Sequence, residues 1–137
     1  MPERAYSTPL LDKLGIKPDA RVAIVNLDAP WFLDLLRERT ANVTMGAPKL
    51  DTDVVIMGAD FPPDFEVLPD LRARIRPNGG IWVVSRKGKG ATVRDVEVIE
   101  RALAAGLVDN KVASFSETQT ALRLVIRVRD RPTTPKG

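Results

Sequence analysis

The side chains best suited to chemistry follow three apolar segments of the chain. Asn26 and Asp28 follow residues 21–25, Asp60 follows residues 53–59, and Ser85, Arg86 and Lys87 follow residues 81–84. If the carboxylates of Asp28 and Asp60 lie close together, they ionise at different pH values, and one of them can serve as a general acid or base. The Arg-Lys-Gly-Lys-Gly run at 86–90 offers positive charge and free N–H groups to an anion. These six residues are the ligand-binding candidates.

Each candidate also has an ordinary structural explanation. Asp28 lies directly before a predicted helix and suits its N-cap, and Asp60 begins a proline-rich turn. The 86–90 run departs from the P-loop pattern and suits a flexible surface loop. No serine, lysine or tyrosine stands in a nucleophile motif, so no catalytic residue is predicted.

Composition removes several classes of site. The 137 residues include no cysteine and no histidine, which excludes disulfides, thiolate nucleophiles and iron–sulfur clusters and removes the commonest zinc ligands. Acid–base chemistry would depend on aspartate, glutamate, lysine or Tyr6. No EF-hand-like spacing appears, and no metal site is predicted.

Charge and hydropathy indicate the partners and the location to expect for the protein. With 21 basic and 18 acidic residues the net charge is +3, a mild excess that predicts no dedicated nucleic-acid surface. No apolar run approaches the roughly 18 residues of a transmembrane helix, and residues 1–6 lack the apolar stretch of a signal peptide. We therefore expect a cytoplasmic protein without a membrane partner, folded as one domain over residues 1–137 with frayed ends at 1–5 and 131–137.

Continuous apolar segments predict the central strands. Strands are expected at 21–26, 53–59 and 81–84, with a shorter one at 42–45 and a hairpin at 111–116 and 121–129. Helices are expected at 8–15 with Thr8 as N-cap, at 30–36, around 68–75 and at 92–106. The Pro-Asn-Gly-Gly run at 77–80 predicts a turn.

Some side chains carry more detailed expectations. In the helix at 92–106, Thr92 and Asp95 resemble a capping box, and the buried face is expected to consist of Val96, Ile99 and Leu103. The aromatic residues expected in the core, because their neighbours are apolar, are Trp31, Trp82 and Phe115.

The last predicted strand alternates apolar and basic residues. Its apolar face consists of Leu122, Leu124, Ile126 and Val128, and its other face of Arg123, Val125, Arg127 and Arg129. Such alternation means that one face is packed while the other is solvated or meets a partner. The three arginines are therefore interface candidates for an acidic partner or a second copy of the chain, and a merely exposed outer face is the alternative.

The order of these elements predicts an α/β protein with a mainly parallel sheet and helices on its faces. Only residues 46–52 separate the strand at 42–45 from the strand at 53–59, whereas a parallel crossover needs about a dozen residues. One strand–helix unit is therefore missing. The predicted fold is a small three-layer, Rossmann-like sheet of about five to six strands that ends in an antiparallel hairpin.

Three stretches carry a resemblance to known proteins. They are YSTPLLDKLGIKPDARVAIVN at 6–26, GGIWVVSRKG at 79–88 and GLVDNKVASFSETQTALRLV at 106–125. The three stretches resemble a small bacterial family of unassigned function. More broadly, the order of strands and helices, with the segments DTDVVIMGAD at 51–60 and LPDLRARIRPNGGIWVVSR at 68–86, resembles a shortened class I methyltransferase fold. The methyltransferase pattern implies a glycine-rich loop where this chain has residues 26–29, and an acidic residue that ends the second strand and holds a ribose. This sequence has neither.

Three functions remain open from the sequence. The first is a non-catalytic methyltransferase-like domain that binds a partner or a small ligand, with no cofactor predicted. The second is an S-adenosylmethionine-dependent methyltransferase with an altered loop, its cofactor lying against residues 26–29 with Asp60 and Ser85 nearby. The third is a homo-oligomeric or polyanion-binding protein that uses its arginine-rich last strand. We favour the first, because the glycine loop and the usual acid–base residues are missing.

Overall fold

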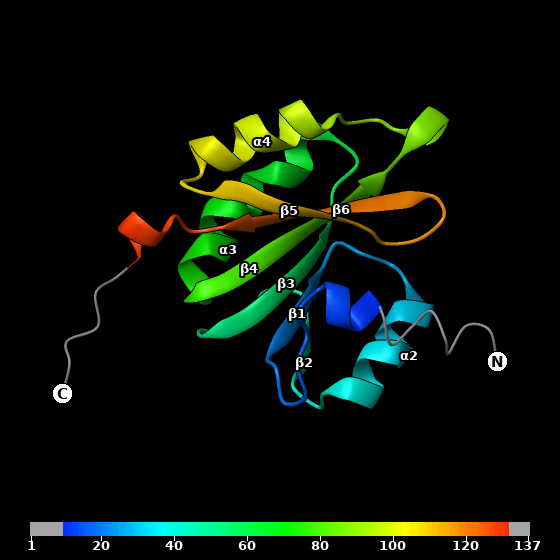
Figure 1. Ribbon diagram of the computed structural model, residues 1–137, viewed down its shortest axis with the longest axis vertical. Coiled ribbons are helices and arrows are strands. Elements are labelled where there is room, and N and C mark those ends of the chain that lie inside the picture. The colour runs from blue at the N-terminus through cyan, green and yellow to red at the C-terminus, as the bar shows by residue number, and fades with distance from the viewer. Residues whose placement is uncertain (1–9, 132–137) are drawn as a thin grey trace.

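The computed structural model describes residues 10–131, which form a six-stranded sheet with helices on both faces (Figure 1). The strands are β1 (Val22–Val25), β2 (Val43–Met45), β3 (Thr52–Gly58), β4 (Ile75–Arg86), β5 (Val108–Ser114) and β6 (Gln119–Val125). Their order is β2-β1-β3-β4-β6-β5, with the first four parallel and the β5–β6 hairpin antiparallel. This arrangement confirms the predicted fold class.

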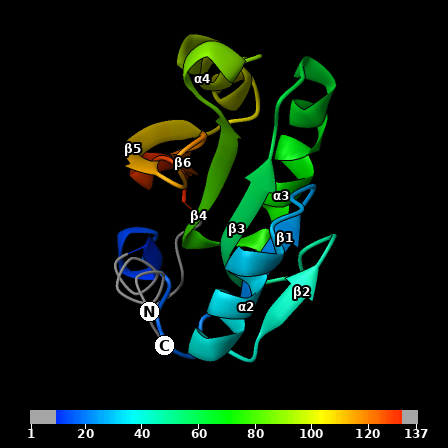
Figure 2. The ribbon, with the colours of Figure 1, turned by 90° about the vertical axis from the view of Figure 1, so that its right-hand side faces the viewer.

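Helices cover the two faces of the sheet separately (Figure 2). The helices are α2 (Pro30–Arg39), α3 (Leu68–Arg74) and α4 (Asp95–Ala104), and the 3-10 turns are η1 (Pro62–Val67), η2 (Gly88–Gly90) and η3 (Val128–Asp130). The predicted first helix is present at residues 10–13 and is followed by Gly15 with a φ of 72°. Its expected N-cap Thr8 lies outside the described residues. None of the helices within 10–131 has the length and apolarity that crossing a bilayer requires.

Strict alternation along β4 divides the apolar core in two. Ile81 and Val83 pack with α3 and α4 on one face, while Trp82 and Val84 pack with α2 and residues 10–16 on the other. Both sets are almost fully buried. Strand β4 is therefore covered on both faces, as its continuous apolar pattern predicts.

The link between β2 and β3 contains no helix. Both strands are parallel to β1 and lie on either side of it. A short segment can make this crossover because β2 has only three residues. The predicted short strand at 42–45 is confirmed as β2, and so is the prediction that no helix separates it from the next strand.

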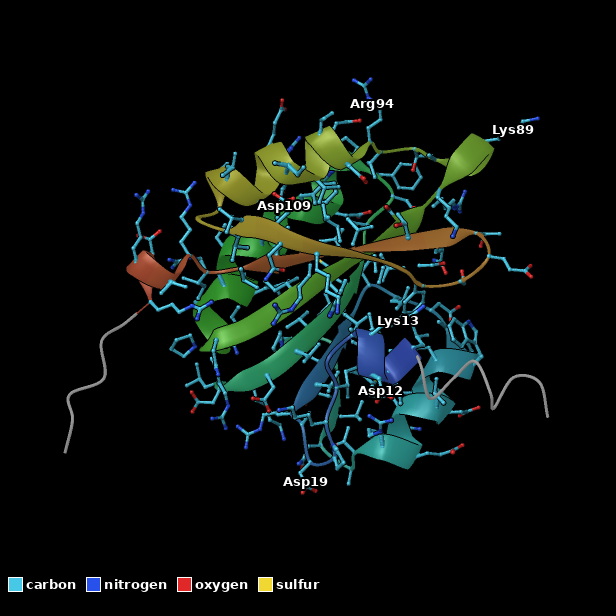
Figure 3. All side chains as sticks on the ribbon, in the orientation of Figure 1. Asp12, Lys13, Asp19, Lys89, Arg94 and Asp109 are labelled. Carbon is cyan, nitrogen blue, oxygen red and sulfur yellow. The ribbon has the colours of Figure 1, made fainter. Side chains whose placement is uncertain are left out.

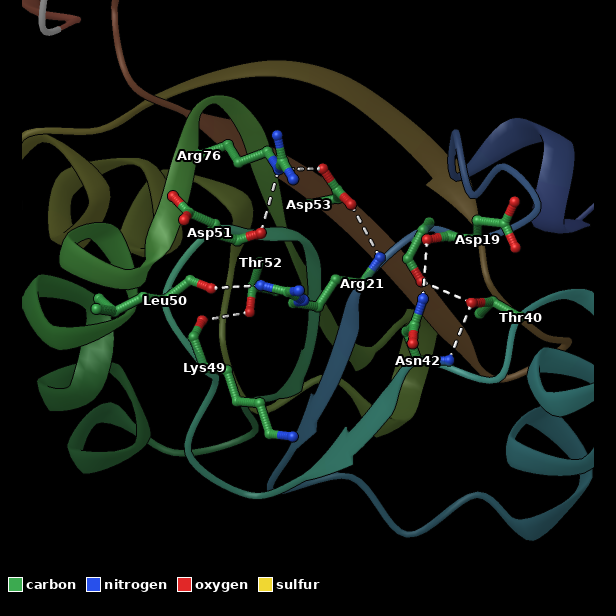
Figure 4. A network of polar contacts seen from close by, with 11 residues as sticks. Asp19, Arg21, Thr40, Asn42, Lys49, Leu50, Asp51, Thr52, Asp53 and Arg76 are labelled. Carbon is green, nitrogen blue, oxygen red and sulfur yellow. Dashed lines mark hydrogen bonds and ion pairs between the residues drawn. The ribbon is translucent and has the colours of Figure 1, made fainter.

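Polar side chains hold the loops at the amino ends of the parallel strands (Figure 4). The Asp53 carboxylate accepts the Arg21 N–H at 2.9 Å and pairs with Nε of Arg76 at 2.9 Å. The buried Thr40 hydroxyl accepts the N–H of Asn42 at 3.1 Å. These contacts connect neighbouring loops and thereby stabilise this edge of the sheet.

The predicted turn at 77–80 is wrong, because these residues belong to β4. The pairs that flank the irregular stretch are Ile75 with Thr52 and Gly80 with Val54. Residues 76–79 therefore bulge out opposite the single residue Asp53. Gly79 is required here, since a methyl group on it would lie 2.8 Å from the carbonyl oxygen of Asp53. The Pro-Asn-Gly-Gly run interrupts the pairing without reversing the chain.

The predicted buried face of α4 is wrong for two of its three residues, Val96 and Leu103. Val98 and Ala102 are buried and Ile99 packs against them, whereas Val96 and Leu103 are 54% and 51% exposed. Apolar residues occupy more than one side of this helix, so their spacing alone did not identify the side that meets the sheet.

The start of α4 differs from the predicted capping box of Thr92 and Asp95. The Glu97 carboxylate accepts the Arg94 N–H at 3.0 Å, and helix α4 begins at Asp95. The Thr92 hydroxyl instead donates to the carbonyl oxygen of Asp60. Thr92 thus connects the loop before α4 to the end of β3.

The last strand is shorter than predicted and ends at Val125. Arg127 and Arg129 lie beyond it, and Val128 is exposed in η3 rather than packed. Only Arg123 of the three interface candidates stands in the sheet, where it is partly buried. The continuous arginine face expected from the alternation is therefore not formed, because the chain leaves the sheet after β6.

Candidate functional site

The loop after β1 packs directly on the end of β3. Asn26 adopts a left-handed conformation with a φ of 53°, which is normally the role of glycine in a tight turn. Its side-chain amide donates to the carbonyl oxygen of Gly58 at 2.9 Å. A methyl group on Gly58 would overlap the carbonyl oxygen of Asn26. Asn26 thus takes the left-handed conformation itself, and Gly58 of β3 leaves the room that the close approach of the turn requires.

This contact lies at the point where the sheet changes direction. The chain passes from β1 to β2 on one side and then returns to β3 on the other side of β1. Open α/β sheets bind ligands at such a point, in the crevice beyond the carboxyl ends of the strands. In this protein the backbone of Asn26 rests against Gly58 at this point, so the loop after β1 lies close over the end of β3.

A small cavity remains beside the loop, between the end of β1, the start of α2 and the end of β2. Its volume is about 100 Å³. The lining residues are Ile24, Leu27, Asp28, Ala29, Pro30, Phe32, Leu33 and Met45. Asp28 supplies the only carboxylate among them, and Met45 stands where the second strand ends. The cavity can take a small apolar group with one polar or cationic atom.

Asp28 does not cap the helix that follows it, contrary to its ordinary explanation. The N-cap of α2 is Ala29, and no side chain caps the helix. Asp28 is exposed at the rim of the cavity, and no hydrogen bond or ion pair joins it to another residue within 10–131. It is therefore free to bind a ligand at this rim.

Asp60 belongs to a separate cluster at the end of β3. Its Oδ1 accepts the N–H of Arg86 at 3.1 Å, and its Oδ2 lies 3.9 Å from Nε of the same residue. Its own N–H donates to the Asp64 carboxylate at 3.0 Å, and its carbonyl oxygen accepts the Thr92 hydroxyl. The Asp60 carboxylate is thus turned towards β4 and holds the 86–92 loop.

The Asp60→Ala variant is expected to lose about 1 kcal/mol of its free energy of unfolding, because a partly exposed charged acceptor is removed from a backbone N–H. The amide of Arg86 should exchange with solvent markedly faster. Hydrogen exchange followed by NMR measures this effect. Asp34→Ala, at an exposed position of α2, is the matched control and should leave the exchange unchanged. Unchanged protection of the Arg86 amide in Asp60→Ala would show that the loop is held by other contacts.

The remaining candidates do not join either group. Ser85 is 4% exposed and pairs with Thr120 inside the sheet. Nζ of Lys87 donates to the Ser114 hydroxyl at 3.0 Å, and its N–H donates to the carbonyl oxygen of Thr118 at 3.0 Å. The structure thus divides the six candidates among the β1 loop, the Asp60 cluster, the interior of the sheet and the tip of the hairpin.

The basic loop extends away from the sheet. Its centre is η2, a single turn without buried residues, and Figure 3 shows Lys89 projecting outward at its tip. A turn of three residues sums too few peptide dipoles to bind an anion as a long helix does. This geometry agrees with the flexible-surface alternative.

An aromatic cluster lies between α2 and the end of β5. Its ring centroids are 5.7 Å apart for Trp31 and Phe32, 5.3 Å for Trp31 and Phe115, and 4.9 Å for Phe32 and Phe115. Phe115 is buried, as predicted, but Trp31 is 48% exposed. The prediction of Trp31 as a core residue is therefore wrong. It covers the edge of the cluster and leaves one side to solvent.

Sequence reasoning missed the residues that close the site. Gly58 ends an apolar strand, which is an unremarkable place for glycine, and nothing nearby shows that a loop 32 residues earlier contacts it. The spacing of Thr92 and Asp95 predicts a helix cap, although the Thr92 hydroxyl donates to the carbonyl oxygen of Asp60. A contact between distant segments leaves no local pattern, so the spacing of residues predicts neither the role of Gly58 nor that of Thr92.

Comparison with known proteins finds similarity only at the level of structure. No protein-family model matches the sequence, and no curated protein matches it. The narrower resemblance to a small bacterial family therefore has no support from these comparisons. Many solved structures match, and several of them are methyltransferases.

Three of these structures illustrate the similarity. An S-adenosylmethionine-dependent methyltransferase from Aquifex aeolicus matches with a TM-score of 0.70 and 12% identity, over 88% of this chain and 89% of its own. Precorrin-6y C5,15-methyltransferase from Geobacter metallireducens gives 0.61 and 10%, over 88% and 86%. Magnesium protoporphyrin IX methyltransferase from Synechocystis, solved with bound S-adenosylmethionine, gives 0.64 and 10%, over 90% and 77%. The chain therefore has the fold of the class I methyltransferases.

Proposed function

We propose that this chain is a methyltransferase-fold domain that binds a small ligand or a partner without transferring a methyl group. The observation that carries the proposal is the contact of Asn26 with Gly58, from which we infer that the chain itself occupies the crevice between β1 and β3. Ligand binding in this fold depends on that crevice. A domain whose crevice is closed still has the same fold, and its surface can bind other ligands or partners.

The residues at the carboxyl ends of the strands do not fit S-adenosylmethionine. The cavity beside the loop at 26–29, about 100 Å³ in volume, is well below the roughly 300 Å³ at which small-molecule sites begin. Met45, where the second strand ends, offers no carboxylate to a ribose. The only carboxylate that lines the cavity is Asp28, and it stands at the exposed rim. No catalytic step is therefore derived through this cofactor.

Isothermal titration calorimetry with S-adenosylmethionine and S-adenosylhomocysteine tests the proposal. We expect no saturable heat from either compound up to about 1 mM, and no increase in the melting temperature. A site with a micromolar dissociation constant, about −8 kcal/mol, would give clear heat, and ligand at 100 times that constant would raise the free energy of unfolding by about 2.7 kcal/mol.

Asp28→Leu is the matched variant for this titration, because Asp28 lines the cavity and makes no hydrogen bond or ion pair within 10–131. Micromolar binding by the wild type that is lost in Asp28→Leu would overturn the proposal. It would instead support a methyltransferase that opens the loop at 26–29 to admit its cofactor.

A further inference from the structure

Arg123 stands in the middle of the hairpin sheet on the face covered by residues 10–16. It pairs directly with Trp82 of β4 and with Lys111 of β5, and residues opposite each other in antiparallel strands point to the same face. Trp82 donates from Nε1 to the carbonyl oxygen of Leu14 at 3.0 Å. Arg123 is therefore held beside this N-terminal segment and is partly buried.

The guanidinium of Arg123 lies over the backbone of Gly80. A methyl group on Gly80 would stand 2.7 Å from Nε and 3.0 Å from Cζ of Arg123. Glycine at this position thus leaves the space that the guanidinium occupies. Because φ of Gly80 is not in the left-handed region, the space and not the backbone conformation is what the glycine provides.

Two further cations accompany Arg123. Lys111 is its cross-strand neighbour, and like charges in that position repel each other. Arg131, whose Nε donates to the carbonyl oxygen of Ile126 at 3.1 Å, is close enough to act on it electrostatically. Burial, and then the charge of Arg131, lower the pKa of Arg123 below its usual value. Both causes disfavour the positive charge at this position.

No carboxylate within 10–131 neutralises this cluster of Arg123, Arg131 and Lys111, which we call the basic cluster. Asp109 pairs with Leu124 and so belongs to the opposite face, on the α4 side of β5 (Figure 3). The other nearby acids are engaged elsewhere, Asp53 with Arg76 and Asp130 with Arg129. Partly buried charge without a counter-ion is costly to the folded protein.

We propose that the basic cluster is a binding site for a phosphate-class dianion. A guanidinium presents a planar fork of donors that matches the oxygens of phosphate, and three cations suit a group that carries close to two negative charges at pH 7. The site lies on the Trp82 face of β4 and β6, apart from the loop at 26–29, so it does not depend on the function proposed above.

Calorimetric titration of the full chain with sodium phosphate at pH 7.5 and constant ionic strength tests this site. The expected dissociation constant is of the order of 1 mM. Arg123→Gln should raise it at least about tenfold and Arg131→Gln about threefold, since each removes one donor group. Gly80→Ala should also weaken binding, because its methyl group displaces the Arg123 side chain, which is flexible enough for the variant to fold. Arg101→Gln, at an exposed position of α4, is the matched control and should bind as the wild type does.

The melting temperature in chloride alone separates binding from folding. Arg123→Gln should melt at the same temperature as the wild type or higher, because an uncompensated charge has been removed. Phosphate should then stabilise Arg101→Gln as much as the wild type, and Arg123→Gln much less. Equal effects of phosphate and of acetate or chloride at the same ionic strength would overturn the proposal, as would unchanged phosphate binding in Arg123→Gln.

Discussion

The Gly58→Ala variant is expected to lose about 3 kcal/mol of its free energy of unfolding, at the upper end of the cost of overpacking a well-packed site. The added methyl group would overlap the carbonyl oxygen of Asn26 and approach Cα of Leu27 at 3.4 Å. These are backbone atoms, so a change of rotamer cannot relieve the overlap. Either the loop at 26–29 moves off β3 or the end of β3 shifts. Urea denaturation followed by circular dichroism measures the loss.

Gly90→Ala is the matched control for this substitution. Its methyl group would meet only Cδ of Arg86, at 4.0 Å, in an exposed turn. The expected change is within about 0.5 kcal/mol, as for ordinary surface substitutions. A Gly58→Ala variant as stable as Gly90→Ala would mean that the loop separates from β3 without cost. The crevice between β1 and β3 would then be open to a ligand, which contradicts the basis of the proposed function.

Trp82→Ala is expected to lose about 3–5 kcal/mol of the free energy of unfolding, the usual cost of removing a large buried aromatic side chain. Trp82 is 1% exposed and packs with both α2 and residues 10–16. Its Nε1 also donates to the carbonyl oxygen of Leu14, which the variant leaves without that donor. Thermal or urea denaturation measures the loss.

The two tryptophans of the chain form a natural pair for this test. Trp31→Ala removes a side chain that is half exposed and contacts Phe32 and Phe115 at one edge. The expected loss is about 1 kcal/mol, the size of an aromatic pair. Equal losses in the two variants would show that the N-terminal segment does not cover Trp82 in solution.

A milder substitution separates the hydrogen bond from the packing. Trp82→Phe keeps an aromatic ring but removes the donor to Leu14. Residues 10–16 should then exchange their amide protons faster while the other strands of the sheet keep their protection, because Trp82 is the polar connection between this segment and β4. The same segment also contacts the basic cluster, because Nζ of Lys111 donates to the carbonyl oxygen of Lys13.

The proposed function and the basic cluster concern different parts of the fold. The first depends on the carboxyl ends of β1 and β3, where Gly58 and Asn26 meet. The second depends on β6 and Gly80. Titration with S-adenosylmethionine and titration with phosphate therefore give independent answers, and Gly58→Ala should not change phosphate binding if the variant remains folded.

The sequence by itself determined the fold class. Apolar runs without alternation at 53–59 and 81–84 can bury both faces only in a sheet that has helices on either side, and the structure has this arrangement. The short link after β2 likewise required that no helix cover that crossover. These properties follow from local pattern and chain length, which the sequence contains directly.

Tertiary structure alone decided which side chains meet. Asp28 and Asp60 follow neighbouring strands, yet Asp60 turns to Arg86 and Asp28 stays at the rim of a cavity. Likewise, the loop at 26–29 approaches the sheet closely because residue 58 is a glycine, and Arg123 owes its position to Gly80 on another strand. Strand register and close backbone approach produce these contacts between distant segments, and no local spacing of residues records them.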